Sequence, residues 1–143
     1  MNLDYAIEQL KRGNINGLEW LVQNYQLPAF QAAFLIVQDE QLAEDVVQDA
    51  YLLVYRKIDQ YDPSRPFEPW FFRVVMNLAV NMAKRQRKYS CLSDETTLDD
   101  VLDTTCALPE KQVEMSEFQD AIWEAMKNLS LHQRRVVVEH YFF

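Results

Sequence analysis

The stretch YDPSRPFEPWFFRVVMNLAVNMAKRQRKY, residues 61–89, joins a proline-rich loop to a helix-forming segment that ends in a cluster of cations. On a helical wheel its side chains separate into two faces. The apolar face holds Phe71, Val74, Val75, Leu78 and Met82, and the polar face holds Trp70, Arg73, Asn77, Asn81, Lys84 and Lys88. Aromatic rings, amides and cations stack on bases, read base edges and neutralise phosphate. The stretch therefore predicts an amphipathic helix whose polar face suits single-stranded nucleic acid.

The rest of the 143-residue chain is also typical of helices, since it contains only two glycines and five prolines. Apolar residues make up 49% of it, which is enough for one well-buried core. We expect helices from about residue 2 to 13, from 16 or 17 to 38, and from a cap at Asp39 to about 61. Pro28 would allow a kink or a restart in the second. Further helices are expected from about 111 to 129 and from 131 onward, so the predicted fold class is all-α.

Charge is unevenly distributed along the chain. The net charge is −8, yet residues 62–88 carry six basic and only two acidic side chains. A basic island between acidic segments favours local contact with a phosphate backbone. Residues 90–109 are acidic and rich in Ser, Thr and Asp, which predicts a flexible linker. We therefore divide the chain into units at 1–89 and 110–143, joined by this linker.

A plainer interpretation of the basic helix is that its C-terminal cations only complement the helix dipole. It does not account for Asn77 and Asn81, which are poor helix formers in line with Arg73. It also leaves unexplained the proline-fixed loop at 62–67, because stiff loops suit preorganised binding sites. Nucleic-acid binding is therefore the preferred interpretation.

The third expected helix presents a second surface to explain. Its outward residues are Asp45, Gln48, Asp49, Leu52, Tyr55 and Arg56. Leu52 and Tyr55 would be polar on a merely solvated face, so an apolar knob ringed by polar groups indicates a helix-on-helix contact with another protein. The alternative is that Leu52 and Tyr55 pack under the first helix.

The sequence offers little for catalysis, metal binding or membrane insertion. Cys91, Cys106, His132 and His140 lack the spacing of a zinc site, so both cysteines are expected to be free thiols. There is no Ser-His-acid set, glycine-rich loop, signal peptide or apolar run of about twenty residues. We predict a cytoplasmic protein that is not an enzyme, binds no cofactor or metal and does not insert into membranes.

Two motifs, in order, resemble conserved region 2 of the extracytoplasmic-function (group IV) sigma factors of bacterial RNA polymerase. AEDVVQDAYLLVY at 43–55 is similar to the family's A-E-D-hydrophobic-V-Q-E-hydrophobic-F signature. FEPWFFRVVMNLAVNMAKRQRK at 67–88 is similar to its F-x-x-W-hydrophobic-hydrophobic-R-I-x-x-N pattern with a basic tail. The resemblance implies a compact helical region 2 at 1–89 and a promoter-specificity subunit rather than an enzyme.

The resemblance also implies partners for the two surfaces. Asp45, Gln48, Asp49, Leu52, Tyr55 and Arg56 would bind the β′ clamp of core RNA polymerase. The single-stranded minus-ten element of promoter DNA would be bound by Asp62, Pro63, Ser64, Arg65, Pro66, Phe67, Trp70, Arg73, Asn77, Asn81, Lys84, Arg85 and Lys88. Many family members carry Asp where Asn81 stands, which leaves the base preference open.

LSLHQRRVVVEHYFF at 129–143 resembles the start of the family's region 4, with Ser130 where Pro is usual. The helix-turn-helix that should follow is absent from the sequence, so we expect an incomplete region 4 that does not read the minus-thirty-five element. The alternative function is a truncated sigma-like interaction protein. It would act as a polymerase decoy, or need a partner chain or an anti-sigma factor. Exposure of the terminal Phe142 and Phe143 would favour this alternative.

Overall fold

The computed structural model describes residues 1–90 and 117–142. These ranges form six α-helices and a short 3-10 turn, with no β-strand among them. The elements are α1 (Leu3–Lys11), α2 (Asn16–Val37), α3 (Glu40–Lys57), η1 (Ile58–Gln60), α4 (Phe67–Ser90), α5 (Glu117–Lys127) and α6 (Leu131–Phe142). The predicted all-helical fold is confirmed for this part of the chain. Cys91, Cys106 and nearly all of the predicted linker lie outside the described residues.

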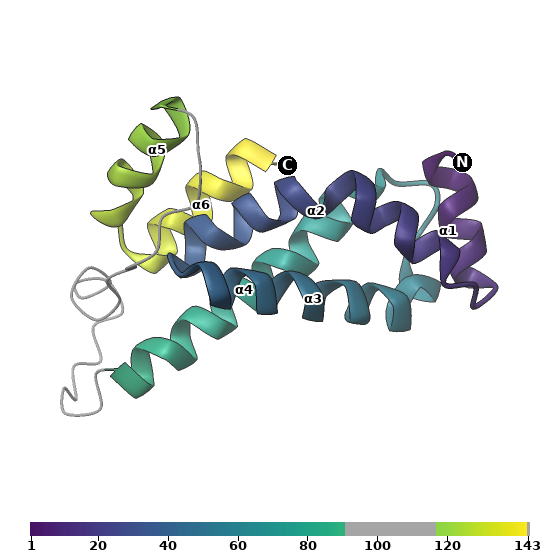
Figure 1. Ribbon diagram of the computed structural model, residues 1–143, viewed down its shortest axis with the longest axis horizontal. Coiled ribbons are helices and arrows are strands. Elements are labelled where there is room, and N and C mark those ends of the chain that lie inside the picture. The colour runs from purple at the N-terminus through teal and green to yellow at the C-terminus, as the bar shows by residue number, and fades with distance from the viewer. Residues whose placement is uncertain (91–116, 143) are drawn as a thin grey trace.

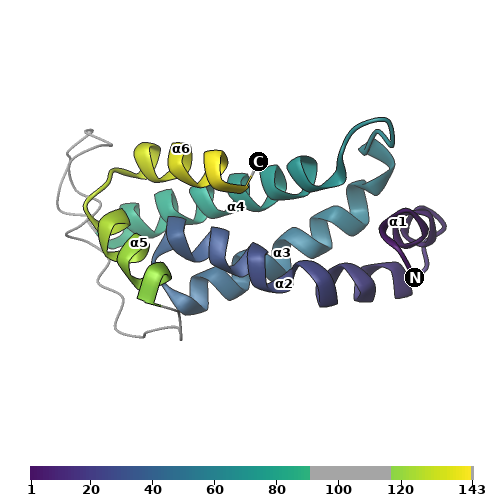
Figure 2. The same cartoon turned by 90° about the horizontal axis from the view of Figure 1, so that it is seen from above.

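Helices α2, α3 and α4 pack against one another along their lengths, and α1 packs at the end of α2 (Figure 1). Helix α6 lies beside both α2 and α4, as the two views agree (Figures 1 and 2). The C-terminal turns of α4 project beyond the bundle at the lower left of Figure 1. The residues before 91 thus form a helical bundle, and α6 rests on it.

Capping side chains explain where two of the helices begin. The side chain of Asn2 accepts a hydrogen bond from the amide of Tyr5 at 3.0 Å, and that of Asp39 accepts one from Leu42 at 3.0 Å. Each bond satisfies an amide that has no partner inside its helix. The predicted cap at Asp39 is confirmed. Pro28 does not divide α2, which continues as one helix from Asn16 to Val37.

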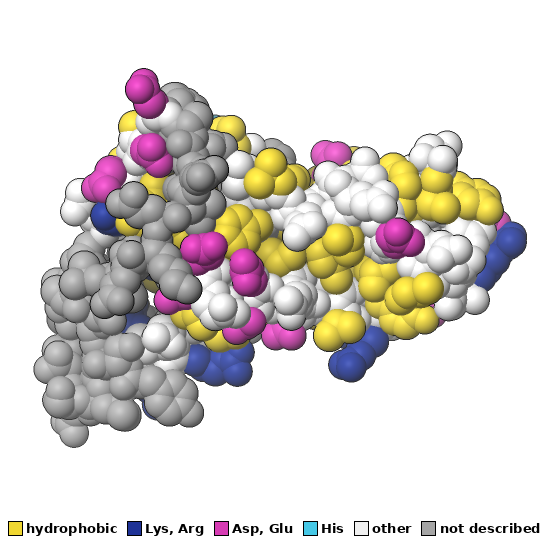
Figure 3. Space-filling model, viewed as in Figure 1, with side chains coloured by type: hydrophobic (Ala, Val, Ile, Leu, Met, Phe, Trp, Pro, Cys, Tyr) yellow, Lys and Arg dark blue, Asp and Glu magenta, His cyan; other side chains and the backbone are white. Residues whose placement is uncertain are grey.

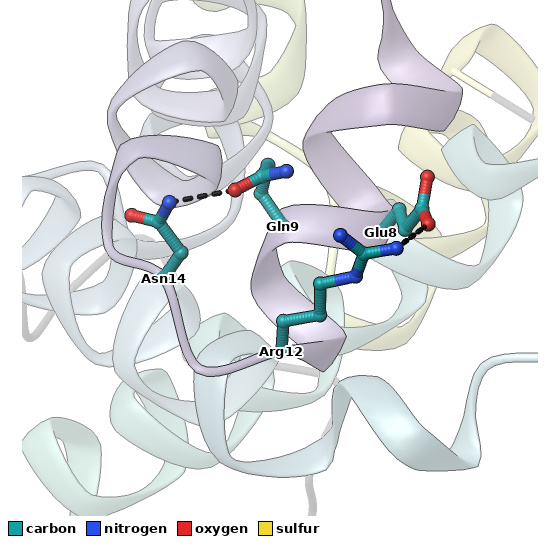
Figure 4. A network of polar contacts seen from close by, with 4 residues as sticks. All are labelled: Glu8, Gln9, Arg12 and Asn14. Carbon is teal, nitrogen blue, oxygen red and sulfur yellow. Dashed lines mark hydrogen bonds and ion pairs between the residues drawn. The ribbon is translucent and has the colours of Figure 1, made fainter.

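The turn between α1 and α2 depends on two glycines. Gly13 has φ of +78°, which glycine adopts without a steric penalty. A Cβ on Gly17 would lie 2.3 Å from the carbonyl oxygen of Ala6, so only glycine permits this approach of α2 to α1. Figure 4 shows the polar contacts around the turn, where Asn14 donates to the side chain of Gln9 at 2.6 Å and Arg12 pairs with Glu8.

An aromatic cluster holds the three long helices together. Phe71 of α4 is fully buried, and its ring centroid lies 5.5 Å from Tyr25 of α2 and 5.6 Å from Tyr51 of α3. Burying such a ring contributes about 1.5–3 kcal/mol relative to leaving it exposed. Burial also raises the pKa of Tyr51. Because one cluster buries the inner sides of α3 and α4, the opposite side of each helix is left for solvent or partners.

Candidate functional site

The polar face of α4 is exposed over most of its length. Its exposed residues are Arg73, Asn77, Asn81, Lys84, Arg85 and Lys88. Its opposite face packs inward, with Phe71 and Val75 buried and Val74, Leu78 and Met82 half-buried. The division predicted from the helical wheel is therefore confirmed. The last three cations of the exposed set lie in the final seven residues of α4, whose C-terminal turns project beyond the bundle (Figure 1).

The loop from 61 to 66 is held by its own hydrogen bonds. The Asp62 side chain accepts from the Ser64 amide at 2.9 Å, and the Asp62 carbonyl accepts from the Arg65 amide at 3.0 Å. The Tyr61 hydroxyl donates to the Arg65 carbonyl at 2.6 Å. The hydrogen bond from Ser64 is the main reason that the pKa of Asp62 is lowered, with a further contribution from Arg65. The carboxylate therefore closes a turn and leaves Pro63, Ser64, Arg65 and Pro66 exposed.

Aromatic packing joins this loop to the start of α4. The Tyr61 ring centroid lies 5.4 Å from Phe67 and 5.5 Å from Trp70, and Phe67 lies 5.8 Å from Trp70. Phe67 is only 2% exposed, so its ring is not presented at the surface of the free chain, and its contact with DNA stays a prediction. Its ring instead fills the core beneath the loop. Trp70 is half-buried, which leaves part of one ring for an external contact.

Helix α4 begins at Phe67, whereas the expected loop included that residue. Pro69 fits inside the first turn because the first four amides of a helix have no intrahelical partner. Glu68 accepts a hydrogen bond from the Tyr25 hydroxyl at 3.1 Å. Burial, followed by the Glu68 carboxylate, raises the pKa of Tyr25 to about 12. The hydrogen bond from the neutral Tyr25 phenol therefore connects the first turn of α4 to α2.

A contact from α6 reaches the middle of the polar face of α4. The Arg135 guanidinium donates to the Asn77 side-chain oxygen at 3.4 Å. No local pattern in the sequence points to Arg135, because it lies 58 positions from Asn77. Asn77 is exposed but engaged by another part of the chain.

The outward face of α3 is exposed at Gln48, Asp49, Leu52 and Arg56, and half-buried at Asp45 and Tyr55. Leu52 is 52% exposed, so it does not pack under the first helix. Tyr55 does approach that helix, because its hydroxyl donates to the Gly13 carbonyl at 3.2 Å. Packing against the first helix is thus right for Tyr55 and wrong for Leu52, and the contact of Leu52 with another protein stays a prediction. Leu52 remains as the apolar knob among polar side chains.

A groove of about 520 Å³ continues this face from α3 onto α2. It is lined by Gln23, Gln26, Leu27, Phe30, Glu40, Glu44, Val47 and Gln48. Figure 3 shows acidic side chains over the left part of this side of the molecule and hydrophobic ones continuing across it. Leu27 is 65% exposed, but the dense apolar sequence around it gave no sign that it points outward. The surface is therefore wider than α3 alone.

Within residues 1–90 and 117–142, no group of three or more His, Cys, Asp or Glu side chains is placed to hold a metal ion. None of the helices described there combines the length and apolarity needed to cross a bilayer. The described surface carries an exposed basic face on α4 and a partly apolar face on α2 and α3 with acidic side chains from α3.

Helices α3 and α4 lie almost entirely in a segment that matches a known protein family. Residues 21–89, which include α3 and nearly all of α4, match the family model Sigma-70 region 2. The chain is 25% identical over 147 residues to the ECF RNA polymerase sigma factor SigW of Bacillus subtilis, covering 99% of this chain and 79% of that protein. It is 26% identical to SigM of the same organism, covering 70% of this chain and 60% of the relative. It is also 30% identical to the RNA polymerase sigma factor CnrH of Cupriavidus metallidurans, and this match covers 65% of this chain and 49% of the relative.

Proposed function

The chain belongs to the ECF RNA polymerase sigma factors, which direct transcription initiation, and from this premise we propose which of its surfaces bind which partner. Sigma factors bind core RNA polymerase and promoter DNA, and they are not enzymes. We propose that the α3 face binds the β′ clamp of core polymerase. We propose that the α4 face, with the loop before it, captures the single-stranded minus-ten element.

The observation that carries this assignment is the opposite chemistry of the two exposed faces. Helix α4 presents Arg73, Lys84, Arg85 and Lys88 to solvent, which suits a phosphate backbone. Helix α3 presents Asp49 beside the half-exposed knob of Leu52, which suits a protein. A nucleic-acid strand would be repelled from the acidic face and attracted to the basic one.

On the proposed polymerase face, Leu52 is the central apolar contact, and Asp45, Gln48, Asp49, Tyr55 and Arg56 form the polar rim. An apolar contact surrounded by a polar rim is the usual arrangement of a protein interface. The acidic rim would pair with basic groups of the clamp and steer the encounter. The neighbouring groove would enlarge the same contact.

On the proposed DNA face, the loop residues Asp62, Pro63, Ser64, Arg65 and Pro66 would border the bound strand. Exposing a base costs a few kcal/mol of unstacking, and aromatic stacking returns about 1–3 kcal/mol per base. Trp70 is half-buried beside the loop, so part of its ring is free to stack on a base. Asn77 and Asn81 carry amides that can read base edges. Arg73, Lys84, Arg85 and Lys88 would neutralise phosphates along the strand.

We propose that residues 1–89 form region 2, that 90–109 form a linker, and that 110–143 hold the beginning of region 4. Helices α5 and α6 fall in this last unit. The chain would act in the cytoplasm, where polymerase and promoter are found. An anti-sigma factor is a further proposed partner.

A second candidate function is a sigma-like interaction protein that occupies polymerase without capturing promoter DNA. Exposed apolar residues on α6 favour it, because Val136 is 52% exposed, Val137 43% and Tyr141 68%. The side chains of Phe142 and Phe143 lie outside the described part of the structure.

Binding to purified core polymerase, followed by addition of a fluorescent single-stranded minus-ten probe, tests the main proposal. We expect the chain to bind polymerase and the complex to capture the probe in preference to a scrambled strand. Polymerase binding without capture would support the second candidate. Failure to bind polymerase would refute both assignments.

A further inference from the structure

Helix α6 is placed by a buried arginine at the carboxyl end of α2. Arg134 is only 4% exposed, and its guanidinium donates to the Leu129 carbonyl at 2.9 Å and to the Ile36 carbonyl at 3.0 Å. Ile36 lies in the last turn of α2, where carbonyls lack intrahelical partners and the helix dipole is negative. A cation that satisfies such a carbonyl in a buried position forms a strong contact.

Two local features fix the position of Arg134. The Ser130 side chain accepts from the Gln133 amide at 3.2 Å, and the Gln133 side chain accepts from the Ser130 amide at 3.0 Å, which together form a capping box at the start of α6. In α5, the Trp123 ring stacks on Phe34 of α2 with centroids 5.9 Å apart. Helices α5 and α6 therefore dock on α2 through an aromatic contact and a buried cation.

This docking brings the next residue of α6 onto the proposed DNA face. Arg135 donates to the Asn77 side-chain oxygen at 3.4 Å and pairs with Glu139 of its own helix at 2.9 Å. The Asn77 oxygen is the acceptor that an amide offers to a base edge. While Arg135 holds it, a base cannot use the same oxygen in the same geometry.

We propose that α5 and α6 form an intramolecular latch on region 2, in which Arg134 is the anchor and Arg135 blocks Asn77. Capture of the minus-ten strand requires Arg135 to leave Asn77. The inference rests on the proposed DNA-binding role of α4. It adds that the free chain is held in a state of low DNA affinity by its own C-terminal helices, and that the docked and released states differ at this contact.

Arg135→Ala tests the latch because the two explanations predict opposite signs. If Arg135 merely contributed a cation to the DNA surface, its removal would weaken strand binding. If it blocks Asn77, its removal strengthens binding of the free chain to the minus-ten probe by about two- to tenfold, the range expected for the loss of one ordinary exposed hydrogen bond. Fluorescence anisotropy at fixed salt measures the change. Arg12→Ala is the matched control, since Arg12 also pairs with an acid four residues away on its helix and is expected to leave binding unchanged.

Amide hydrogen exchange gives an independent readout. We expect residues 131–142 to be protected in the free wild-type chain and to lose protection when core polymerase and probe are both added. Arg134→Met should remove that protection while leaving residues 40–57 protected. If Arg134→Met fails to fold, Arg135→Ala and the wild-type exchange still decide the question.

Unchanged or weaker probe binding by Arg135→Ala, with protection of α6 retained in the complex, would overturn the latch while leaving the proposed function intact. Failure of the wild-type complex with polymerase to capture the probe would instead refute the DNA-binding role on which the latch rests. The two failures are thus distinguishable in the same set of samples.

Discussion

Helices α3 and α4 pack against the same buried rings but expose surfaces of different chemistry. The inner side of α3 contributes Tyr51 to the cluster and the inner side of α4 contributes Phe71, with their centroids 5.6 Å apart. Outward, α3 is acidic with an apolar knob, whereas α4 carries amides and cations. The shared core fixes the direction of each face, so the partner proposed for each face depends on its exposed residues. The two roles are therefore separable by mutation.

The largest effect is expected from breaking the shared core. Phe71→Ala should lower the free energy of unfolding by about 3–5 kcal/mol, because it removes a fully buried ring and leaves a cavity between three helices. Urea unfolding followed by circular dichroism measures the loss. Leu52→Ala is the control, since this side chain is half exposed and its truncation should change stability by no more than about 0.5 kcal/mol. Equal losses for both variants would show that α3 and α4 do not share this core.

Charge reversal on α3 should weaken binding to core polymerase without altering the DNA face on α4. We expect Asp45→Arg to weaken binding to core polymerase at least about thirtyfold, or ~2 kcal/mol, because the acidic rim would now repel the basic partner. Co-purification and titration with core polymerase measure this. Lys84→Ala should retain polymerase binding in the same assay. Undiminished binding by Asp45→Arg, with the fold intact by circular dichroism, would remove the assignment of the α3 face.

Asn77 and Lys84 lie two turns apart on α4, and substitutions at the two positions should change DNA binding in different ways. Asn77→Ala should reduce discrimination between the minus-ten sequence and a scrambled strand by about 1–3 kcal/mol, because an amide that reads a base edge is lost. Competition binding in the polymerase complex measures the preference. A uniform loss across all sequences would contradict a base-reading role.

Lys84→Ala should instead weaken every strand alike. Removing one phosphate contact lowers the slope of log affinity against log salt by about 0.7 for single-stranded DNA. Titrations at several salt concentrations measure the slope, and the matched comparison is Asn77→Ala, whose slope should equal that of the wild type. Lost sequence preference in Lys84→Ala would show that the two positions share one role.

The smallest expected effect concerns the loop before α4. The folded-state pKa of Asp62 is lowered by its hydrogen bond with Ser64, so the turn is stabilised above the ordinary Asp pKa and loses this contribution as pH falls below that value. The Ser64 amide resonance should therefore change only under more acidic conditions than an unperturbed Asp would require. Asp62→Asn should abolish this titration. A Ser64 shift that follows the ordinary Asp range would contradict the hydrogen-bonded turn.

Local sequence patterns were sufficient for the helices and their faces. Asp39 marked the start of α3, and the spacing of apolar residues from Phe71 to Met82 identified the inner side of α4. Both signals depend on neighbours within a few turns, which is why they survive in the folded chain. Pro28 was less informative, because α2 continues through it.

Contacts between distant segments could not be predicted in the same way. Phe67 looked like a loop residue, but the rings of Tyr25, Tyr61 and Phe71 enclose it. No pattern in the sequence singles out Arg134, yet it is buried against a carbonyl 98 positions away. Such positions are decided by how helices meet, which no periodic pattern records.

The central claim, that α3 and α4 face different partners in one complex, is tested most directly by photo-crosslinking. A photoreactive amino acid replaces Arg56 on α3 or Arg85 on α4, and each chain is bound to core polymerase and a promoter whose minus-ten region is unpaired. We predict crosslinks from position 56 to the β′ subunit and from position 85 to the minus-ten strand. Crosslinks from both positions to the same partner, or the reverse pairing, would contradict the account.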